Sequence, residues 1–286
     1  MRKKLIADDW LSAREARELI FHFIRWGEHS YHYLRQLTNR SIEAELAMRG
    51  YDLSKQVSEL QNNPYRCIAE FENLLAGGTY EITVSPGAKV TASLNVDGVE
   101  ITRRDVEEHS VLRQAHSADF LAACNARDVA IQKLSFDNFY TSVSKGFSSI
   151  EAYFSLRVAV YNNHCKDPAK RLEEKRPKGG FVSLDEKIKD WLPIMTGVNL
   201  DISKSPGWAD YKYLRKIRND VVIHPKPDAG LSTLDELADG INRFRYGVGG
   251  LMFVLHQSFK EPAQSSIIRA MLYPTVRVVK SDIETP

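Results

Sequence analysis

Apolar side chains recur at helical spacing through residues 136–163, the most strongly patterned stretch of the chain. Its aromatic and aliphatic positions are Phe139, Tyr140, Val143, Phe147, Ile150, Tyr153, Phe154, Val158 and Val160. Residues three and four apart share one face of a helix, so this stripe predicts a long helix with a wide buried face. A chain built around such a helix is expected to be mainly α.

Weaker amphipathic patterns predict helices on both sides of this stretch. Ser41 and Ser183 are well placed as N-caps, and Pro225 and Pro227 set the end of a helix that begins at Trp208. The predicted helices cover residues 8–37, 41–60, 64–77, 105–163 with a break near Asn125 or Ser135, 184 to 192 or 195, 208–223 and 233–259, with a further turn or two at 265–272.

Between these helical regions the apolar residues change from helical spacing to alternation. Residues 79–84 are rich in β-formers, residues 89–96 alternate, and Asp97-Gly98 is a strong hairpin turn before a short strand at 99–102. The fold class that we expect is therefore mainly α, a helical bundle with a small antiparallel β meander inserted before it. We divide the chain into an N-terminal helical region (1–78), the meander (79–104), the bundle (105–264) and a C-terminal extension (265–286).

The composition is that of a globular protein, with 43% hydrophobic and 27% charged residues. A formal net charge of +2 is low for a protein that coats nucleic acid, so a nucleic-acid contact is expected from a local patch. The three cysteines are widely spaced and predict neither a disulfide framework nor a zinc site. Asp8 and Asp9 interrupt the basic start, and the longest apolar run has about ten residues where a membrane span needs about 20. We expect a cytoplasmic protein with no membrane contact.

Residues 213–225 read YLRKIRNDVVIHP. Five residues, the first of them Asn219, separate Arg218 from His224. This order of residues at the end of a late helix, with an earlier long helix expected beside it, resembles the signature of the HEPN domain family. The resemblance covers roughly residues 115–260, about half of the chain.

The resemblance implies a HEPN-like bundle and a metal-independent endoribonuclease that uses no cofactor. It assigns Arg218, Asn219 and His224 to the catalytic site. HEPN nucleases pair so that two signatures face each other, so the resemblance also implies a homodimer with a composite active site. The biological setting that it suggests is a toxin or defence effector that cuts RNA, restrained by an antitoxin or another regulatory partner.

The chemistry of RNA cleavage suits these residue types. Attack by a 2′-hydroxyl needs one proton removed and another delivered to the leaving 5′-oxygen, and a histidine, with an ordinary pKa of about 6.5, can do either. The planar, permanently charged guanidinium of Arg218 suits the charge on the phosphate oxygens, and Asn219 would orient the phosphate or the imidazole. In an ideal helix Arg218 and His224 lie on different faces, and Pro225 disfavours a helical conformation at His224.

Charged residues near the signature are candidates for substrate binding, and they are Lys212, Arg215, Lys216, Lys226 and Glu151. The basic ones, with the loop at 166–180, would line a cleft for phosphates, although a solvated charged face explains them equally well. Glu151 lies on the long helix, where it would either hold Arg218 or remain a surface charge.

Other interpretations stay open. A non-catalytic HEPN-like module would dimerise, or bind RNA or a nucleotide without cutting it, and a helical scaffold would need no nucleic acid. Arg218 and His224 are also ordinary capping residues for a helix C-terminus. His22, His29 and His32 with Glu28 offer a metal site, although they lack the order found in zinc proteases.

Overall fold

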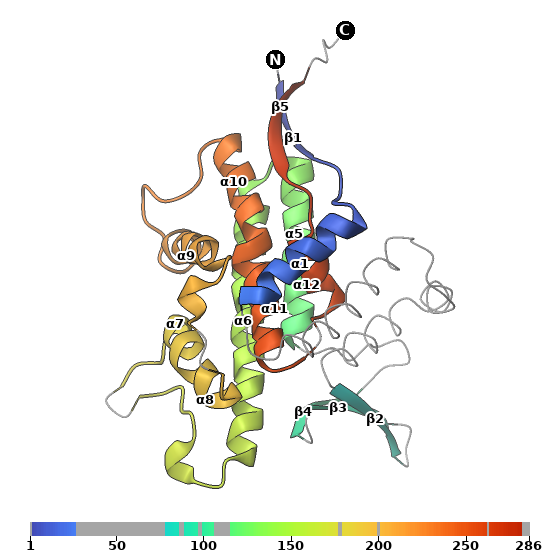
Figure 1. Cartoon of the computed structure of the whole chain (residues 1–286), viewed down its shortest axis with the longest axis vertical. Helices are drawn as coiled ribbons and strands as arrows, with labels where there is room; N and C mark the ends of the chain where they lie inside the picture. Colours follow the sequence, from blue (N-terminus) through green and yellow to red (C-terminus); the bar gives the residue numbers. More distant parts are fainter. Residues whose placement is uncertain are drawn as a thin grey trace.

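The computed structural model describes residues 2–26, 78–85, 89–96, 99–105, 115–176, 179–198, 201–261 and 263–281. The predicted helices at 41–60 and 64–77, and the residues Glu28, His29 and His32, lie outside this part of the chain. The described part is mainly helical with small antiparallel sheets, which confirms the predicted fold class (Figure 1).

The centre of the molecule is a helical hairpin of α5 (Ala115–Lys133) and α6 (Phe136–His164). The chain turns between them at Leu134, which has a φ of 52°, and the Ser135 hydroxyl then accepts the Asn138 amide at 3.3 Å as the N-cap of α6. The long patterned stretch therefore forms the helix that its apolar stripe predicts. Among its aromatic side chains, Phe139, Phe147, Tyr153 and Phe154 are fully buried and Tyr140 is partly buried.

The predicted signature helix is present as α9 (Trp208–Ile217), which continues directly into a π-helical turn, η4 (Arg218–Ile223). A second long helical segment follows and consists of α10 (Leu234–Phe244), the π-helical turn η5 (Arg245–Gly250) and α11 (Leu251–Ser258). It corresponds to the helix predicted at 233–259.

Backbone contact sets the position of α9 on this second segment. A Cβ atom at Gly247 in η5 would lie 2.7 Å from the backbone of Asp210 and Tyr211 in α9. A Cβ atom at Gly207, directly before α9, would meet the Tyr246 carbonyl oxygen at 2.1 Å. The two helices approach this closely because both positions lack a side chain.

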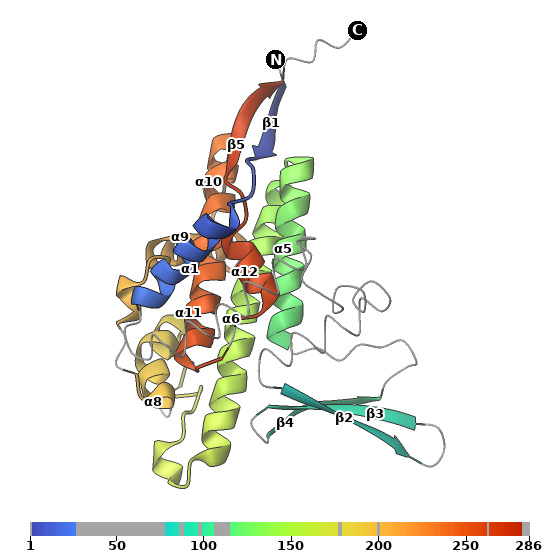
Figure 2. The same cartoon turned by 45° about the vertical axis from the view of Figure 1, so that its right-hand side comes forward.

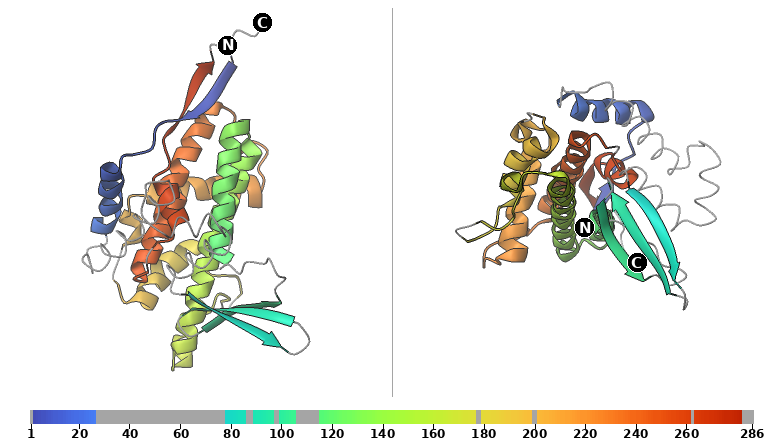
Figure 3. Two further views of the ribbon diagram at one scale, coloured as in Figure 1. Left: turned by 90° about the vertical axis from the view of Figure 1, so that its right-hand side faces the viewer. Right: turned by 90° about the horizontal axis from the view of Figure 1, so that it is seen from below.

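A bent helical segment lies between α6 and α9 in the sequence and beside both in space (Figure 3). It consists of α7 (Leu184–Glu186), the π-helical turn η2 (Lys187–Trp191) and α8 (Leu192–Thr196). Ser183 and Glu186 form a capping box at its start, as the N-cap role predicted for Ser183 requires. Short 3₁₀ turns, η1 (Pro168–Lys170) and η3 (Ile202–Lys204), stand before and after it.

The first and last strands of the described part of the chain form a ribbon that the sequence patterns did not predict. The strand β1 (Arg2–Ala7) pairs antiparallel with β5 (Val276–Ser281), which follows α12 (Ser265–Met271). The helix α1 (Ala13–Trp26) begins five residues later than predicted, because Ser12 and Glu15 form a capping box there.

The helix α1 packs on the bundle through α11, where the Phe23 and Phe253 rings have centroids 6.3 Å apart. The division into domains stays a prediction, and the structure adds that both described ends of the chain contact the bundle.

The predicted meander is confirmed as β2 (Gly78–Ser85), β3 (Lys89–Val96) and β4 (Val99–Asp105), paired antiparallel in that order. It lies beside α6, which β4 contacts (Figure 2). Among the helices that the structure describes, none has the length and apolar composition needed to cross a membrane.

Candidate functional site

The signature residues lie where the α9 helix widens and ends. The His224 amide donates to the Asn219 carbonyl at 2.8 Å, and the Lys226 amide donates to the Asp220 carbonyl at 2.9 Å. The first of these bonds spans five residues where an α-helix spans four, which makes the turn π-helical. His224 then leaves the helix with φ −130° and ψ 72°, in agreement with the restriction that Pro225 places on it.

Arg218 points inward from this turn and pairs with Glu151 of α6. Its two terminal nitrogens donate to the two Glu151 carboxylate oxygens at 2.8 and 3.1 Å. The Arg218 side chain is 16% exposed, and its guanidinium carbon lies 5.3 Å from the centre of the Phe147 ring. Of the two alternatives that the sequence left open for Glu151, the structure has the pairing with Arg218, and this pairing holds the guanidinium plane in one orientation.

The third nitrogen of the Arg218 guanidinium, Nε, is buried and has no hydrogen-bond partner in the described part of the chain. Two of the three guanidinium nitrogens are therefore occupied by Glu151, and one donor is unsatisfied. An unsatisfied buried donor costs free energy, and an acceptor that reached it would recover that cost.

His224 lies on the surface. Its side chain is exposed, and within the described ranges no side chain forms a hydrogen bond with its imidazole. Val222 and Ile223, directly before it, are 40% and 44% exposed, which places apolar surface beside the imidazole. Asn219 is half-buried and contacts His224 through the backbone bond described above.

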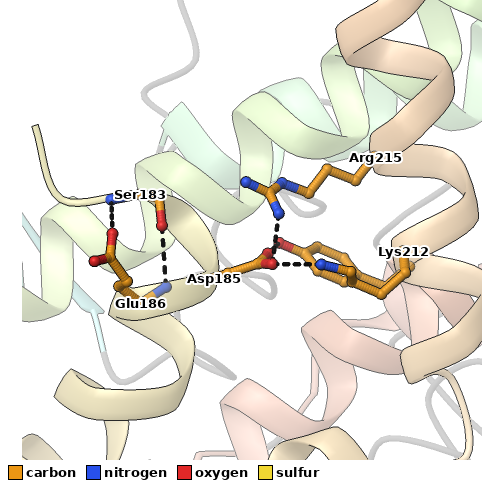
Figure 4. A network of polar contacts seen from close by, with 6 residues as sticks. Ser183, Asp185, Glu186, Lys212 and Arg215 are labelled. Atoms are coloured by element: carbon orange, nitrogen blue, oxygen red, sulfur yellow. Dashed lines mark hydrogen bonds and ion pairs between the residues drawn. The ribbon is translucent and has the colours of Figure 1, made fainter.

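Two of the predicted phosphate-binding residues converge instead on one carboxylate, Asp185 in the first turn of α7 (Figure 4). Its Oδ2 atom accepts the Lys212 ammonium at 2.7 Å and the Arg215 guanidinium at 2.5 Å. Its Oδ1 atom accepts the Tyr211 hydroxyl at 2.7 Å. These bonds tie α7 to α9 along the row of side chains that leads to Arg218.

The Asp185 network also changes the protonation behaviour of its members. Burial raises the pKa of Asp185, but hydrogen bonds from Lys212 and Tyr211 and the charge of Arg215 outweigh burial, so its pKa lies below the ordinary value. Burial, followed by the hydrogen bond to Asp185, raises the pKa of Tyr211 far above its ordinary value. Asp185 is therefore ionised and Tyr211 neutral at physiological pH.

The two remaining lysines predicted to bind phosphate differ, since Lys226 forms an ion pair and Lys216 forms none within the described part of the chain. The Lys226 ammonium lies 2.6 Å from an Asp220 carboxylate oxygen. Lys216 is exposed and forms no ion pair with any described residue. In the basic loop, Arg176 pairs with Glu186, and Lys187 just beyond it pairs with Glu174 at 2.6 Å. Acidic partners thus neutralise Lys212, Arg215, Lys226 and Arg176 of the predicted positive lining.

Sequence reasoning missed Asp185 and Tyr211. Asp185 lies in the first turn of α7, and the helix dipole alone is enough to explain an acidic residue there. Tyr211 has the spacing of an ordinary core aromatic residue. The spacing of Tyr211, Lys212 and Arg215, at i, i+1 and i+4, was the available signal for donors near one side of α9. Among the described residues no group of histidines, cysteines and carboxylates is arranged to hold a metal ion.

No protein-family model, no curated protein and no solved structure matches this chain.

Proposed function

We propose that the protein is a metal-independent endoribonuclease of HEPN type. The observation that supports this function best is the contrast between Arg218, fixed by Glu151, and His224, exposed at the end of the same helix. RNA cleavage needs a positive group held still against the phosphate and a proton-transfer group that reaches the substrate. Arg218 is the positive group that is held still, and His224 is the exposed group that can transfer a proton.

In the proposed reaction the RNA 2′-oxygen bonds to the adjacent phosphorus and the bond from phosphorus to the 5′-oxygen breaks. One imidazole removes the 2′-hydroxyl proton, and a protonated imidazole delivers a proton to the leaving 5′-oxygen. The Arg218 guanidinium, held in one orientation by Glu151, stabilises the charge on the non-bridging oxygens. Asn219 orients the phosphate or the imidazole.

Each copy of the chain supplies one His224, so two copies supply the acid and the base. This agrees with the homodimer that the HEPN resemblance implies. The exposed Val222 and Ile223 beside His224 support such pairing, because burying them against a second copy would remove apolar surface from water and bring the imidazoles together.

A toxin or defence role in the cytoplasm, with an antitoxin or other regulatory partner, is part of the same proposal. It rests on the resemblance alone. The Asp185 network agrees with a restrained enzyme, since Lys212 and Arg215 are already bound to a carboxylate that an RNA phosphate would have to displace.

Purified protein incubated with a mixed RNA pool in EDTA tests this function. We expect wild-type protein to cut RNA, and Arg218→Ala and His224→Ala to lose at least about 100-fold in rate, the usual scale for a positioned acid–base or charge-stabilising group. The matched controls are Arg243→Ala, another arginine held by carboxylates, and His22→Ala, another exposed histidine. Equal activity in all five proteins would show that the signature does not catalyse cleavage.

The second candidate is a non-catalytic HEPN-like module that dimerises or binds RNA. The carboxylates that occupy Arg218, Lys212, Arg215 and Lys226 favour it, since each pair is satisfied without a ligand. Binding of intact RNA or dimer formation without any cleavage, under conditions in which Arg218→Ala and His224→Ala behave as wild type, supports this candidate over the nuclease.

A further inference from the structure

The two described ends of the chain form an antiparallel ribbon that projects from one end of the bundle (Figures 1 and 2). β1 and β5 pair along their whole length, from Arg2 opposite Ser281 to Ala7 opposite Val276. At the base, Leu5 is 7% exposed and Val276 is 2% exposed, so these side chains anchor one face of the ribbon in the core. The rest of the ribbon extends beyond the helices.

Positive charge is concentrated on this ribbon. The strand sequences are RKKLIA and VRVVKS, which contain five lysines and arginines and no acidic residue. The whole chain has a formal net charge of only +2, so the remainder of the molecule is net negative. The ribbon therefore differs in charge from the body that carries it.

Lys3 and Lys280 are directly opposite each other in the register. Like charges at directly opposed positions destabilise an antiparallel pair. The one described acidic contact of Lys3 is with Asp235 at 3.7 Å, between side chains that are 55% and 71% exposed, which is too exposed to offset much of this repulsion. A bound polyanion would relieve it.

The other face of the ribbon continues the same charge. Lys4 and Arg277 are exposed and belong to the face opposite the Leu5 anchor, because successive residues of a strand alternate between faces. Arg277 is 63% exposed and bonds to Asp8 at 2.8 Å, at the base of the ribbon. Positive side chains thus stand on both faces and at the outer end.

We propose that the β1–β5 ribbon binds the phosphate backbone of a nucleic acid. Lysine and arginine side chains on a narrow, projecting two-stranded ribbon reach phosphates on both of its sides, and a ribbon of this width fits beside or within a groove. The contact is with the backbone, so it is independent of sequence and sensitive to salt.

This inference goes beyond the proposed nuclease activity, because the ribbon contains none of the signature residues. It is connected to the signature by position: Lys3 lies near Asp235 in the first turn of α10, and the chain enters α10 from the loop that follows His224. A nucleic acid bound along the ribbon is held at the end of the bundle to which this loop leads.

The test is fluorescence anisotropy with a labelled RNA hairpin and a labelled DNA duplex of equal length. All proteins carry His224→Ala, so the probe stays intact and the result does not depend on cleavage. The informative variant is Lys280→Glu, which replaces the repulsion across from Lys3 by attraction, so the ribbon should become more stable while its charge falls. The control is Lys189→Glu, the same charge change at an exposed position on η2.

We expect Lys280→Glu to bind at least one probe about fivefold to tenfold more weakly near 0.1 M salt, with a shallower salt dependence. The control should lose less than about twofold, and Tm should not fall in the Lys280→Glu protein. The probe that loses affinity identifies RNA or DNA as the ligand. Equal losses in the two variants, or unchanged binding of both probes, would overturn the proposal.

Discussion

Arg218 and Glu151 stand 67 positions apart in the sequence and share two hydrogen bonds, of 2.8 and 3.1 Å, between α6 and the π-helical turn η4. The pair joins the long α6 helix to the end of the signature helix. Because Arg218 is mostly buried and Glu151 is 41% exposed, the pair is intermediate between a buried and a surface ion pair. Its contribution to stability should be intermediate as well.

Glu151→Ala removes the carboxylate and leaves the mostly buried Arg218 guanidinium without this partner. We expect the free energy of unfolding to fall by about 1–2 kcal/mol, between the values for exposed and buried pairs. Urea denaturation at neutral pH measures this change.

Asp239→Ala is the matched control for this measurement. It removes one carboxylate from Arg243, an arginine that is 35% exposed and keeps a second partner in Asp210. We expect a loss below about 0.5 kcal/mol, as for other exposed i,i+4 pairs. A Glu151→Ala protein as stable as this control would mean that the Arg218 pair does not hold the signature turn.

Asp185→Asn should release Lys212 and Arg215 from their shared anion without changing the size of the side chain. If these residues contact RNA, the variant should bind an RNA hairpin about threefold to tenfold more tightly than wild type, because no protein carboxylate competes with the phosphate. Fluorescence anisotropy in the His224→Ala background measures the affinity.

The control is Asp201→Asn, which frees an exposed lysine, Lys204, away from the signature. Weaker or unchanged RNA binding by Asp185→Asn would place Lys212 and Arg215 outside the RNA-binding surface.

Helical spacing was sufficient to predict most of the described helices. In α6, for example, the apolar side chains lie on one face only if the segment is helical, and only then can they be buried together. The π-helical turns were not predictable, since η4 depends on a bond between the His224 amide and the Asn219 carbonyl that no apolar period encodes. The β1–β5 ribbon was missed for a different reason. Its strands lie at opposite ends of the sequence, and each is too short to be recognised without its partner.

At the candidate site, sequence reasoning offered the Arg218 pairing as one of two alternatives for Glu151, because Glu151 was expected on a neighbouring helix. It did not predict that Lys212 and Arg215 would share Asp185, because such convergence depends on how α7 lies against α9. The sequence shows how many basic side chains lie near the signature, but only the structure shows which of them already pair with a carboxylate of the protein.

Gly247→Ala should separate α9 from η5. Its Cβ atom would lie 2.7 Å from the backbone of Asp210 and Tyr211, which cannot rotate away as a side chain would. We expect a loss of about 2–3 kcal/mol in the free energy of unfolding, despite the better helix propensity of alanine.

Gly249→Ala, two residues further along the same turn, is the control. Its Cβ atom would meet side chains at 3.4 Å, so we expect a change of less than about 1 kcal/mol. Equal stability of the two variants would show that close backbone contact does not position the signature helix.

His116 provides a prediction about pH that is separate from the signature. The side chain is 2% exposed and its Nε2 atom lies 3.1 Å from the Gln264 amide nitrogen. Burial, with the charge of Arg157, lowers the pKa of His116 to about 3. The folded protein therefore keeps this imidazole neutral under mildly acidic conditions, whereas the unfolded chain protonates it below about pH 6.5.

A histidine whose folded pKa is lowered contributes stability that is complete above its unfolded pKa and is lost as the pH falls below that value. Between pH 7.5 and pH 5.0 the His116 contribution should cost the wild type about 2 kcal/mol. His116→Gln cannot take up this proton, so its free energy of unfolding should fall less over the same interval. Urea denaturation at the two pH values measures the difference, and His22→Gln, at an exposed position on α1, should follow the wild type. Identical pH dependence in the wild-type and His116→Gln proteins would mean that His116 takes up its proton equally in the folded and unfolded states.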